Sequence, residues 1–165
     1  MIAKDDLRRM VIIRQFTDEM LDKMIPFVER LPFEDREAVF RQGDSAELFY
    51  MLIKGKVLLE QRLSDKMTVS MDAIKPGYSF GWSAMLRGDL DPYSQYTSDA
   101  ICVEPCEVFA IKGEQFHDLL EADHSMGYTM TKSLNRVIKQ RLVHRTEQFV
   151  RIIKKHPDME NLISG

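Results

Sequence analysis

Turn signals recur along the middle of this chain, from Phe33 to about Ile111, and separate short runs of β-branched and aromatic residues. The spacing is about 8 to 12 residues, which is typical of antiparallel strands in a small sandwich or barrel. The signals are Gly43-Asp44, Lys54-Gly55-Lys56, Ser64-Asp65-Lys66 and Lys75-Pro76-Gly77. A chain with this pattern is expected to have an all-antiparallel centre.

Five strands can be placed from the alternation of side chains. The expected strands are residues 48–53, 57–63, 67–74, 98–103 and 107–111. The first two flank Gly55 and are predicted to form a hairpin. Pro105 has no N–H group to donate to a strand ladder, so it is expected to mark the bend between the last two strands.

Helical periodicity surrounds this region on both sides. Residues 1–32 predict two short helices in series, the second with Thr17 as its N-cap. Helical spacing returns after Gly113 and continues to His156. The sequence therefore predicts one α+β domain with N-terminal helices at 1–32, an antiparallel β region at 33–112, C-terminal helices at 113–156 and a frayed tail at 157–165.

Charge is distributed unevenly along the chain. The 23 Lys and Arg residues against 26 Asp and Glu give a net charge of −3, which argues against a protein that binds nucleic acid over its whole surface. Residues 126–156 nevertheless hold eight basic residues and the single acid Glu147, a net +7, so the remainder carries −10. A basic helix is thus attached to an acidic body.

Several classes of protein are excluded by composition. No apolar run approaches the roughly 20 residues of a membrane helix, and the charged residues between Met1 and Arg9 do not fit a signal peptide. The two cysteines, Cys102 and Cys106, are too few for a disulfide-stapled scaffold. We therefore expect a cytoplasmic protein without a membrane span and with reduced thiols.

No pattern of catalytic or metal-binding residues is present. The sequence has no G-x-S-x-G, Walker or dinucleotide-binding motif. All four histidines fall after Gly113, outside the predicted strands, and two thiols cannot complete a zinc site. We expect no enzymatic activity, no metal and no cofactor.

One segment, Lys75 to Leu86, interrupts the strand pattern. Gly77 and Gly81 permit close approach of the backbone, and residues 82–86 are long enough for one helical turn. A helix N-terminus preceded by glycine can bind an anion, although the same turn also occurs where nothing binds.

Four motifs in order give the chain a resemblance to a known family. They are Phe40-Arg41-Gln42-Gly43-Asp44, then Leu48 to Val57, then Ile74 to Gly81, and finally Val103-Glu104-Pro105-Cys106-Glu107. The chain resembles the cyclic nucleotide-binding domains of the catabolite-activator and Fnr superfamily from about Phe16 to Leu142. The resemblance implies an eight-stranded jelly roll flanked by helices, with a phosphate-binding cassette at residues 80–97.

The cassette departs from the family at its two charged positions. The resemblance implies a glutamate for the ribose hydroxyl and an arginine for the cyclic phosphate, and here these positions are Trp82 and Tyr96. Loss of the arginine alone should weaken cyclic nucleotide binding by roughly one to two orders of magnitude, at about 1.5–3 kcal/mol per charged hydrogen bond.

Two interpretations of the aromatic residues compete, and weak binding of a cyclic nucleotide is the third alternative. In the first, the pocket is rebuilt for another small-molecule effector, with Phe80, Gly81, Trp82, Ser83, Ala84, Tyr96 and Thr97 as the ligand-binding residues. In the second, the aromatic side chains fill a vacated site, and the roll acts only as a dimerising protein-interaction module.

The long C-terminal helix is the other functional candidate. Its apolar stripe consists of Met130, Leu134, Val137, Ile138, Leu142 and Phe149. The resemblance implies that this helix joins two protomers in a parallel homodimer; the alternative is that the stripe packs back on its own roll. The basic side could contact nucleic acid without sequence specificity, a membrane surface or an acidic partner protein. Because no helix-turn-helix follows, we expect no sequence-specific DNA binding.

The whole sequence predicts a non-enzymatic regulatory or sensor domain that signals through its C-terminal helix.

Overall fold

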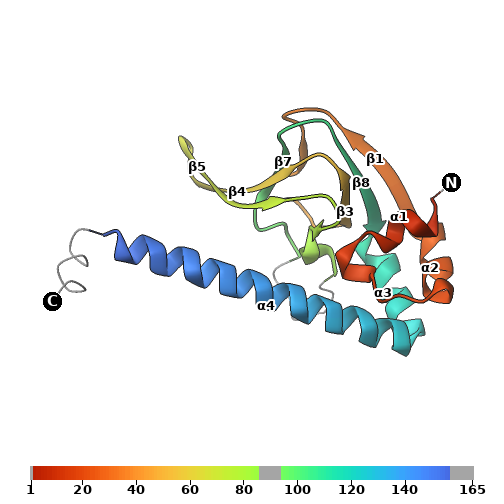
Figure 1. Ribbon diagram of the computed structural model, residues 1–165. Helices are drawn as coiled ribbons and strands as arrows, with labels where there is room; N and C mark the ends of the chain where they lie inside the picture. Colours follow the sequence, from red (N-terminus) through yellow and green to blue (C-terminus); the bar gives the residue numbers. More distant parts are fainter. Residues whose placement is uncertain (1, 86–93, 157–165) are drawn as a thin grey trace. The chain divides into compact units, whose positions relative to one another are not determined.

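The computed structural model describes residues 2–85 and 94–156 (Figure 1). Its backbone contacts separate into two compact units, residues 1–130 and residues 131–165. The first unit holds the N-terminal helices, all of the strands and the start of the last helix. The second unit holds the remainder of that helix.

The chain begins with four short helical segments. They are α1 (Lys4–Arg8), the 3₁₀ turn η1 (Val11–Ile13), α2 (Asp18–Met24) and the 3₁₀ turn η2 (Ile25–Phe27). As predicted, Thr17 caps α2, where its Oγ1 accepts a hydrogen bond from the N–H of Met20 at 3.3 Å. Five of their apolar residues are at most 1% exposed: Leu7, Ile12, Ile13, Leu21 and Met24. These segments therefore form a small apolar cluster, as amphipathic helices should.

The helical prediction is wrong at its end, because residues 28–33 are the strand β1 (Val28–Phe33). Pro26 lies in η2 and cannot donate to an α-helical ladder. The segment then pairs with β8 from Val28 opposite Ile111 to Phe33 opposite Cys106. Pairing with a distant strand thus overrides a helical spacing that continued to Leu31.

Two antiparallel four-stranded sheets make up the roll (Figure 1). One sheet has the order β1, β8 (Cys106–Lys112), β3 (Leu48–Lys54) and β6 (Ser79–Phe80). The other has the order β2 (Ala38–Phe40), β7 (Asp99–Cys102), β4 (Val57–Ser64) and β5 (Met67–Ile74). The antiparallel jelly roll and the α+β class are confirmed.

The predicted hairpin around Gly55 is also corrected. β3 pairs with β6 and β8, whereas β4 pairs with β5 and β7, so the turn at Gly55 carries the chain from one sheet to the other. Gly55 has φ +93°, and a Cβ there would lie 2.6 Å from the Cys106 Sγ. Glycine is required because the corner is tight in both conformation and space.

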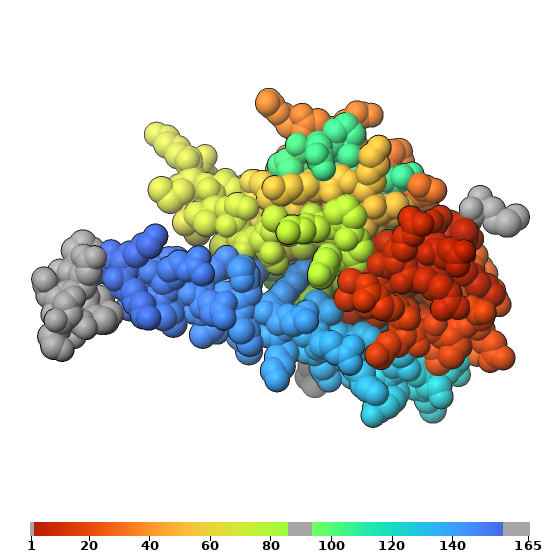
Figure 2. Space-filling model, in the orientation of Figure 1, coloured from red at the N-terminus to blue at the C-terminus, as the bar shows by residue number. Residues whose placement is uncertain are grey.

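The true hairpin of this region is β4–β5, which turns at Ser64 to Lys66. Figures 1 and 2 show it, in yellow to yellow-green, projecting from the rest of the roll. Its outer residues Leu63, Met67 and Val69 are exposed. The buried residues of the roll lie farther down the same strands, at Val57, Leu59 and Ile74.

After β8 the chain enters α3 (Gly113–Ala122) and then α4 (His124–Lys154). The Asp123 carboxylate accepts a hydrogen bond from the N–H of Met126 at 3.0 Å and so caps the start of α4. The presence of α4 confirms the predicted long C-terminal helix. In the second unit, Ile138, Leu142 and Phe149 are 46%, 64% and 63% exposed, and Leu134 and Val137 are half-buried. Over the described ranges, no helix is both long and apolar enough to cross a membrane.

Candidate functional site

The candidate site begins where β6 ends. Gly81 follows Phe80 with φ +73°, and a Cβ at this position would lie 2.9 Å from Cδ2 of Tyr50 and 3.1 Å from the carbonyl oxygen of Leu48. The chain then forms the 3₁₀ turn η3 (Trp82–Met85), closed by a hydrogen bond from the Ala84 N–H to the Gly81 carbonyl at 3.2 Å. The single turn predicted after Gly81 is confirmed.

Trp82, at the position where the resemblance implies a glutamate, folds back on its own segment. Its indole Nε1–H donates to the hydroxyl of Ser79 at 3.0 Å, and Ser79 is buried. The indole is half-buried. Trp82 therefore anchors the start of η3 to β6.

Tyr96, at the position where the resemblance implies an arginine, is held by its backbone. The Gly43 N–H donates to the Tyr96 carbonyl and the Tyr96 N–H donates to the Asp44 carbonyl, both at 2.9 Å. The Ala46 N–H donates to the Ser94 carbonyl at 2.7 Å. The segment that leads into β7 is thus bonded to the loop before β3.

The side chain of Tyr96 points into the roll and is only 5% exposed. Its hydroxyl donates to the carbonyl oxygen of Leu48 at 2.8 Å and accepts from the N–H of the same residue at 3.1 Å. Its ring stacks on Phe40, with ring centroids 3.7 Å apart and planes inclined by 10°. Both ends of the side chain are therefore fixed.

Four aromatic rings fill the interior beneath the cassette: Phe40, Tyr50, Phe80 and Tyr96. Tyr50 stacks on Phe80 at 5.2 Å, and Phe40 lies 5.8 Å from Tyr50 and 6.0 Å from Phe80, all between ring centroids. We call these four residues the aromatic cluster. All are at least 93% buried and belong to the main core of the roll.

The aromatic cluster is electrically neutral at physiological pH. Burial, together with the neighbouring Tyr96, raises the pKa of Tyr50 well above its usual range. Burial also raises the pKa of Tyr96, although the hydrogen bond from the Leu48 N–H to its oxygen partly opposes this. The four side chains of the cluster carry no positive charge, so a phosphate placed among them would need a cation from another part of the chain.

The Arg41 guanidinium, which belongs to the first family motif, is paired with Asp99. Arg41 Nη1 lies 3.1 Å from Oδ2 of Asp99, a buried carboxylate that also accepts the N–H of Gln42 at 2.7 Å and has Arg62 at 3.6 Å. Burial alone would raise the pKa of Asp99, but the hydrogen bonds from Gln42 and Arg41 lower it overall. Asp99 is an ionised anchor for the first residues of β7.

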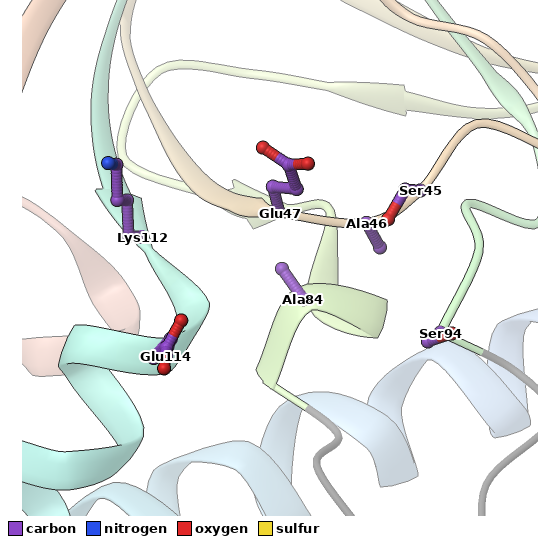
Figure 3. A pocket seen from close by; sticks show the side chains of 7 residues that line it. All are labelled: Ser45, Ala46, Glu47, Ala84, Ser94, Lys112 and Glu114. Atoms are coloured by element: carbon purple, nitrogen blue, oxygen red, sulfur yellow. The ribbon is translucent and has the colours of Figure 1, made fainter.

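A cavity of about 400 Å³ lies on the other side of η3 (Figure 3). Its lining residues are Ser45, Ala46, Glu47, Ala84, Ser94, Lys112 and Glu114. Figure 3 shows the Ala84 methyl group pointing toward the loop at Ala46 and Glu47, while α3 presents Glu114. The lining combines two carboxylates, one ammonium and two hydroxyls, so it suits a small polar molecule better than an apolar one.

Close packing fixes the wall between this cavity and α3. A Cβ on Gly113 would lie 1.8 Å from the carbonyl oxygen of Ala84, and the Gly113 N–H donates to the Glu47 carbonyl at 2.9 Å. Glycine at the first position of α3 thus lets both η3 and the loop before β3 pack directly against the backbone of α3.

The predicted site residues separate into three groups. The first group, Phe80, Gly81 and Tyr96, meets at the aromatic cluster, and the second is Ala84, which lines the cavity. The remaining residues lie in neither place: Trp82 is bonded to Ser79, Ser83 is half-buried and Thr97 is exposed. The cassette predicted at residues 80–97 includes 86–93, which lie outside the described residues, as does the predicted tail at 157–165.

Sequence reasoning missed part of both surfaces. Phe40 and Tyr50 lie within the family motifs, but nothing in the sequence indicates that they meet Tyr96. Glu47, Lys112 and Glu114 were not predicted either, because Glu47 is far in the sequence from the other two and no motif connects them. Within residues 2–85 and 94–156, no three His, Cys, Asp or Glu side chains converge to hold a metal ion.

Comparison with known proteins identifies the family. Residues 30–123 match the family model described as the cyclic nucleotide-binding domain. A search of curated proteins finds no match.

Solved structures agree with this result. A structure from Geobacter metallireducens, described as that of a cyclic nucleotide-binding protein, is 26% identical with a TM-score of 0.71, and the match covers 86% of this chain and 99% of that one. The sensor domain of the transcriptional regulator DNR from Pseudomonas aeruginosa is 19% identical with a TM-score of 0.67, covering 84% and 90%. The catabolite activator protein of Thermus thermophilus is 19% identical with a TM-score of 0.69; the match covers 86% of this chain and 62% of that protein.

Proposed function

Since this chain belongs to the cyclic nucleotide-binding domain family, we propose that it is a non-enzymatic regulatory domain whose roll interior does not accept a cyclic nucleotide. The observation that carries this proposal is the inward, doubly bonded side chain of Tyr96. The roll then acts as a rigid module, and its output is assembly through α4.

Charge is the first argument. A cyclic phosphate is an anion, and burying it without an ionic partner is costly. The aromatic cluster supplies none, and the Arg41 guanidinium is paired with Asp99. The absence of an arginine at position 96 removes charge-assisted hydrogen bonds of about 1.5–3 kcal/mol each.

Space is the second argument. A ligand entering beneath Gly81 would have to displace the Tyr96 ring from Phe40 and break both hydrogen bonds to Leu48. Exposing a buried aromatic side chain costs about 1.5–3 kcal/mol in hydrophobic energy alone. Both terms oppose binding, so the ligand-free interpretation receives the stronger support.

Titration calorimetry with cyclic AMP and cyclic GMP tests the proposal. The wild-type chain should give no saturable heat with either nucleotide up to about 1 mM, which corresponds to less than about 4 kcal/mol of binding energy. The double variant Trp82→Glu/Tyr96→Arg should gain affinity where circular dichroism shows it folded. Saturable binding by the wild-type chain would overturn the proposal.

A second candidate function rests on the cavity beside η3. A small polar effector could bind between Glu47, Lys112 and Glu114 and act on η3, which packs against α3 at Gly113. This candidate keeps the interpretation that the domain binds another small molecule. Of the predicted ligand-binding residues, only Ala84 would contact that molecule. A thermal-shift panel of metabolites tests it: an effector should raise the melting temperature of the wild type more than that of Glu114→Gln. No shift across the panel would count against it.

Homodimerisation through the second unit is the remaining part of the proposal. Leu134, Ile138, Leu142 and Phe149 follow each other at spacings of four, four and seven, which places them on one helix face. The last three are 46–64% exposed, which is unusual for large apolar residues in a row. Val137 belongs to the same stripe, whereas Met130, also predicted to face a partner, is only 1% exposed and lies in the core of the first unit. A second copy of this helix therefore fits the stripe from Leu134 onward.

Sedimentation velocity checks the dimer with a matched pair of variants. Leu142→Lys should shift the protein to monomer, because it places a charge in the apolar stripe. Val143→Lys lies about 100° around the helix and is also exposed, so it should leave the dimer intact. A monomeric wild type, or equal effects of the two variants, would contradict dimerisation by this face.

A further inference from the structure

The two cysteines meet where the chain passes between the sheets. Cys102 is the last residue of β7 and Cys106 is the first of β8, so three residues separate them across the bend at Pro105. Both are free, and they are 0% and 4% exposed. They belong to different sheets, because β7 pairs with β2 and β4 while β8 pairs with β1 and β3.

Both cysteines lie beside the same short segment, Lys56 and Val57. Cys102 is the strand partner of Val57, and the Cys106 Sγ lies 3.4 Å from the carbonyl oxygen of Lys56, the preceding residue. Burial and a hydrogen bond between the two thiols raise the pKa of Cys102 to about 12. The two thiols therefore interact, and Cys102 is protonated at neutral pH.

The cover over this corner is thin. Gly55 has no side chain, and the space a Cβ would occupy lies 2.6 Å from the Cys106 Sγ. Val103, Glu104 and Pro105 are exposed, and the bend is held by the Val103 N–H bonded to the Lys56 carbonyl at 3.0 Å. Local opening of a three-residue bend would expose Cys106 without unfolding either sheet.

We propose that Cys102 and Cys106 form a reversible intramolecular disulfide that joins the two sheets of the roll. With oxidised glutathione as the oxidant, the Cys106 thiolate attacks one glutathione sulfur, and one glutathione leaves as its thiolate. Cys102 then loses its proton to solvent and attacks the Cys106 sulfur, releasing the second glutathione. Two protein thiols are oxidised and one glutathione disulfide is reduced to two glutathione molecules.

The experiment uses the folded full chain treated with oxidised glutathione, then unfolded in urea with iodoacetamide and measured by mass spectrometry. The expected product has lost two hydrogen atoms, takes up no alkyl group and recovers both thiols after dithiothreitol. The melting temperature of the oxidised form should rise by a few degrees, since the closed loop is short. Two alkylated cysteines after prolonged oxidation, or a disulfide between two chains, would overturn the proposal.

Single variants test the order of attack. Cys102→Ser should accumulate one glutathione on Cys106, because the resolving thiol is absent. Cys106→Ser should react more slowly, because Cys102 is fully buried. Faster glutathionylation of Cys106→Ser than of Cys102→Ser would contradict the assigned order, and the wild-type mass measurement remains decisive should either variant fold poorly.

Discussion

The two sides of the cassette differ in nearly every physical respect. On the inner side, Tyr96 and Phe80 are buried among aromatic rings, and the polar atoms of Tyr96 are bonded to backbone. On the outer side, Ala84 borders a cavity whose charged lining residues are exposed. The same short stretch of backbone therefore contributes core on one side and open polar surface on the other.

Under the proposed function, the family's site is closed while its framework is kept. Gly81, η3 and the backbone bonds of Tyr96 hold the path of the chain, while the Tyr96 side chain occupies the interior. Stability should depend on the inner side, and any small-molecule chemistry on the outer side. The following substitutions test that contrast.

Removal of the Tyr96 ring should have the largest effect. Tyr96→Ala deletes a ring stacked on Phe40 and both hydrogen bonds to Leu48, so the free energy of unfolding should fall by about 3–5 kcal/mol. Urea denaturation measures it. Thr97→Ala, at the adjacent exposed position, should change it by less than about 0.5 kcal/mol. A loss under about 1 kcal/mol for Tyr96→Ala would mean that the ring is not part of the core.

The wall between the two sides should be nearly as sensitive. Gly113→Ala forces a Cβ against the Ala84 carbonyl oxygen, so we expect a loss of about 3 kcal/mol despite the better helix propensity of alanine. Thermal denaturation provides the measurement. Gln115→Ala, at an exposed position two residues further along, is the control. Equal stability of the two variants would show that η3 can move away from the added Cβ at little cost.

Acid should weaken the strand that follows the cassette. The folded-state pKa of Asp99 is lowered, so its carboxylate stabilises the fold above its unfolded pKa of about 4 and loses that contribution as pH falls through the folded value. Asp99→Asn should cost about 1–2 kcal/mol at pH 7. Its stability should also fall less steeply between pH 5 and pH 2. Asp65→Asn, in the exposed β4–β5 turn, should retain the wild-type profile; an unchanged slope for Asp99→Asn would contradict the assigned role.

The outer side should tolerate change. Glu114→Gln removes an exposed charge from the cavity lining, and the free energy of unfolding should change by less than about 0.5 kcal/mol. Chemical denaturation checks this value. A loss above about 1.5 kcal/mol would show that the cavity lining is structural, and the contrast between the two sides would then fail.

Local signals predicted much of the fold. Gly77, Gly81 and Pro105 marked turns by conformational constraints that act within a few residues, and the strands from Leu48 to Ile74 were placed within one residue. Thr17 and the helices after Gly113 followed from capping and spacing. These features depend on neighbours in sequence, which a sequence pattern contains.

Features set by distant contacts were beyond that reasoning. β1 depends on pairing of Val28 with Ile111, and the sheet change at Gly55 depends on Cys106. For the candidate site, the sequence identified Trp82 and Tyr96 as the residues that depart from the family pattern. It did not predict that Trp82 would bond to Ser79 and Tyr96 to Leu48. Side-chain direction depends on packing between segments far apart in the chain.

The hydroxyl of Tyr96 completes the hydrogen bonding at the start of strand β3. The backbone groups of Leu52 form hydrogen bonds with Gly77 and Tyr78, on the side of β3 that faces β6. Because the direction of these groups alternates along a strand, the backbone N–H and carbonyl of Leu48 face the same side. The two-residue strand β6 ends before it reaches Leu48. The Tyr96 hydroxyl takes the place of a neighbouring strand there, because it accepts a hydrogen bond from the Leu48 N–H and donates one to the Leu48 carbonyl. An arginine at position 96 could not both bind a phosphate and cap this strand. Arginine at this position would thus leave both backbone groups of Leu48 without this partner, so a gain in nucleotide affinity should be accompanied by a loss of stability.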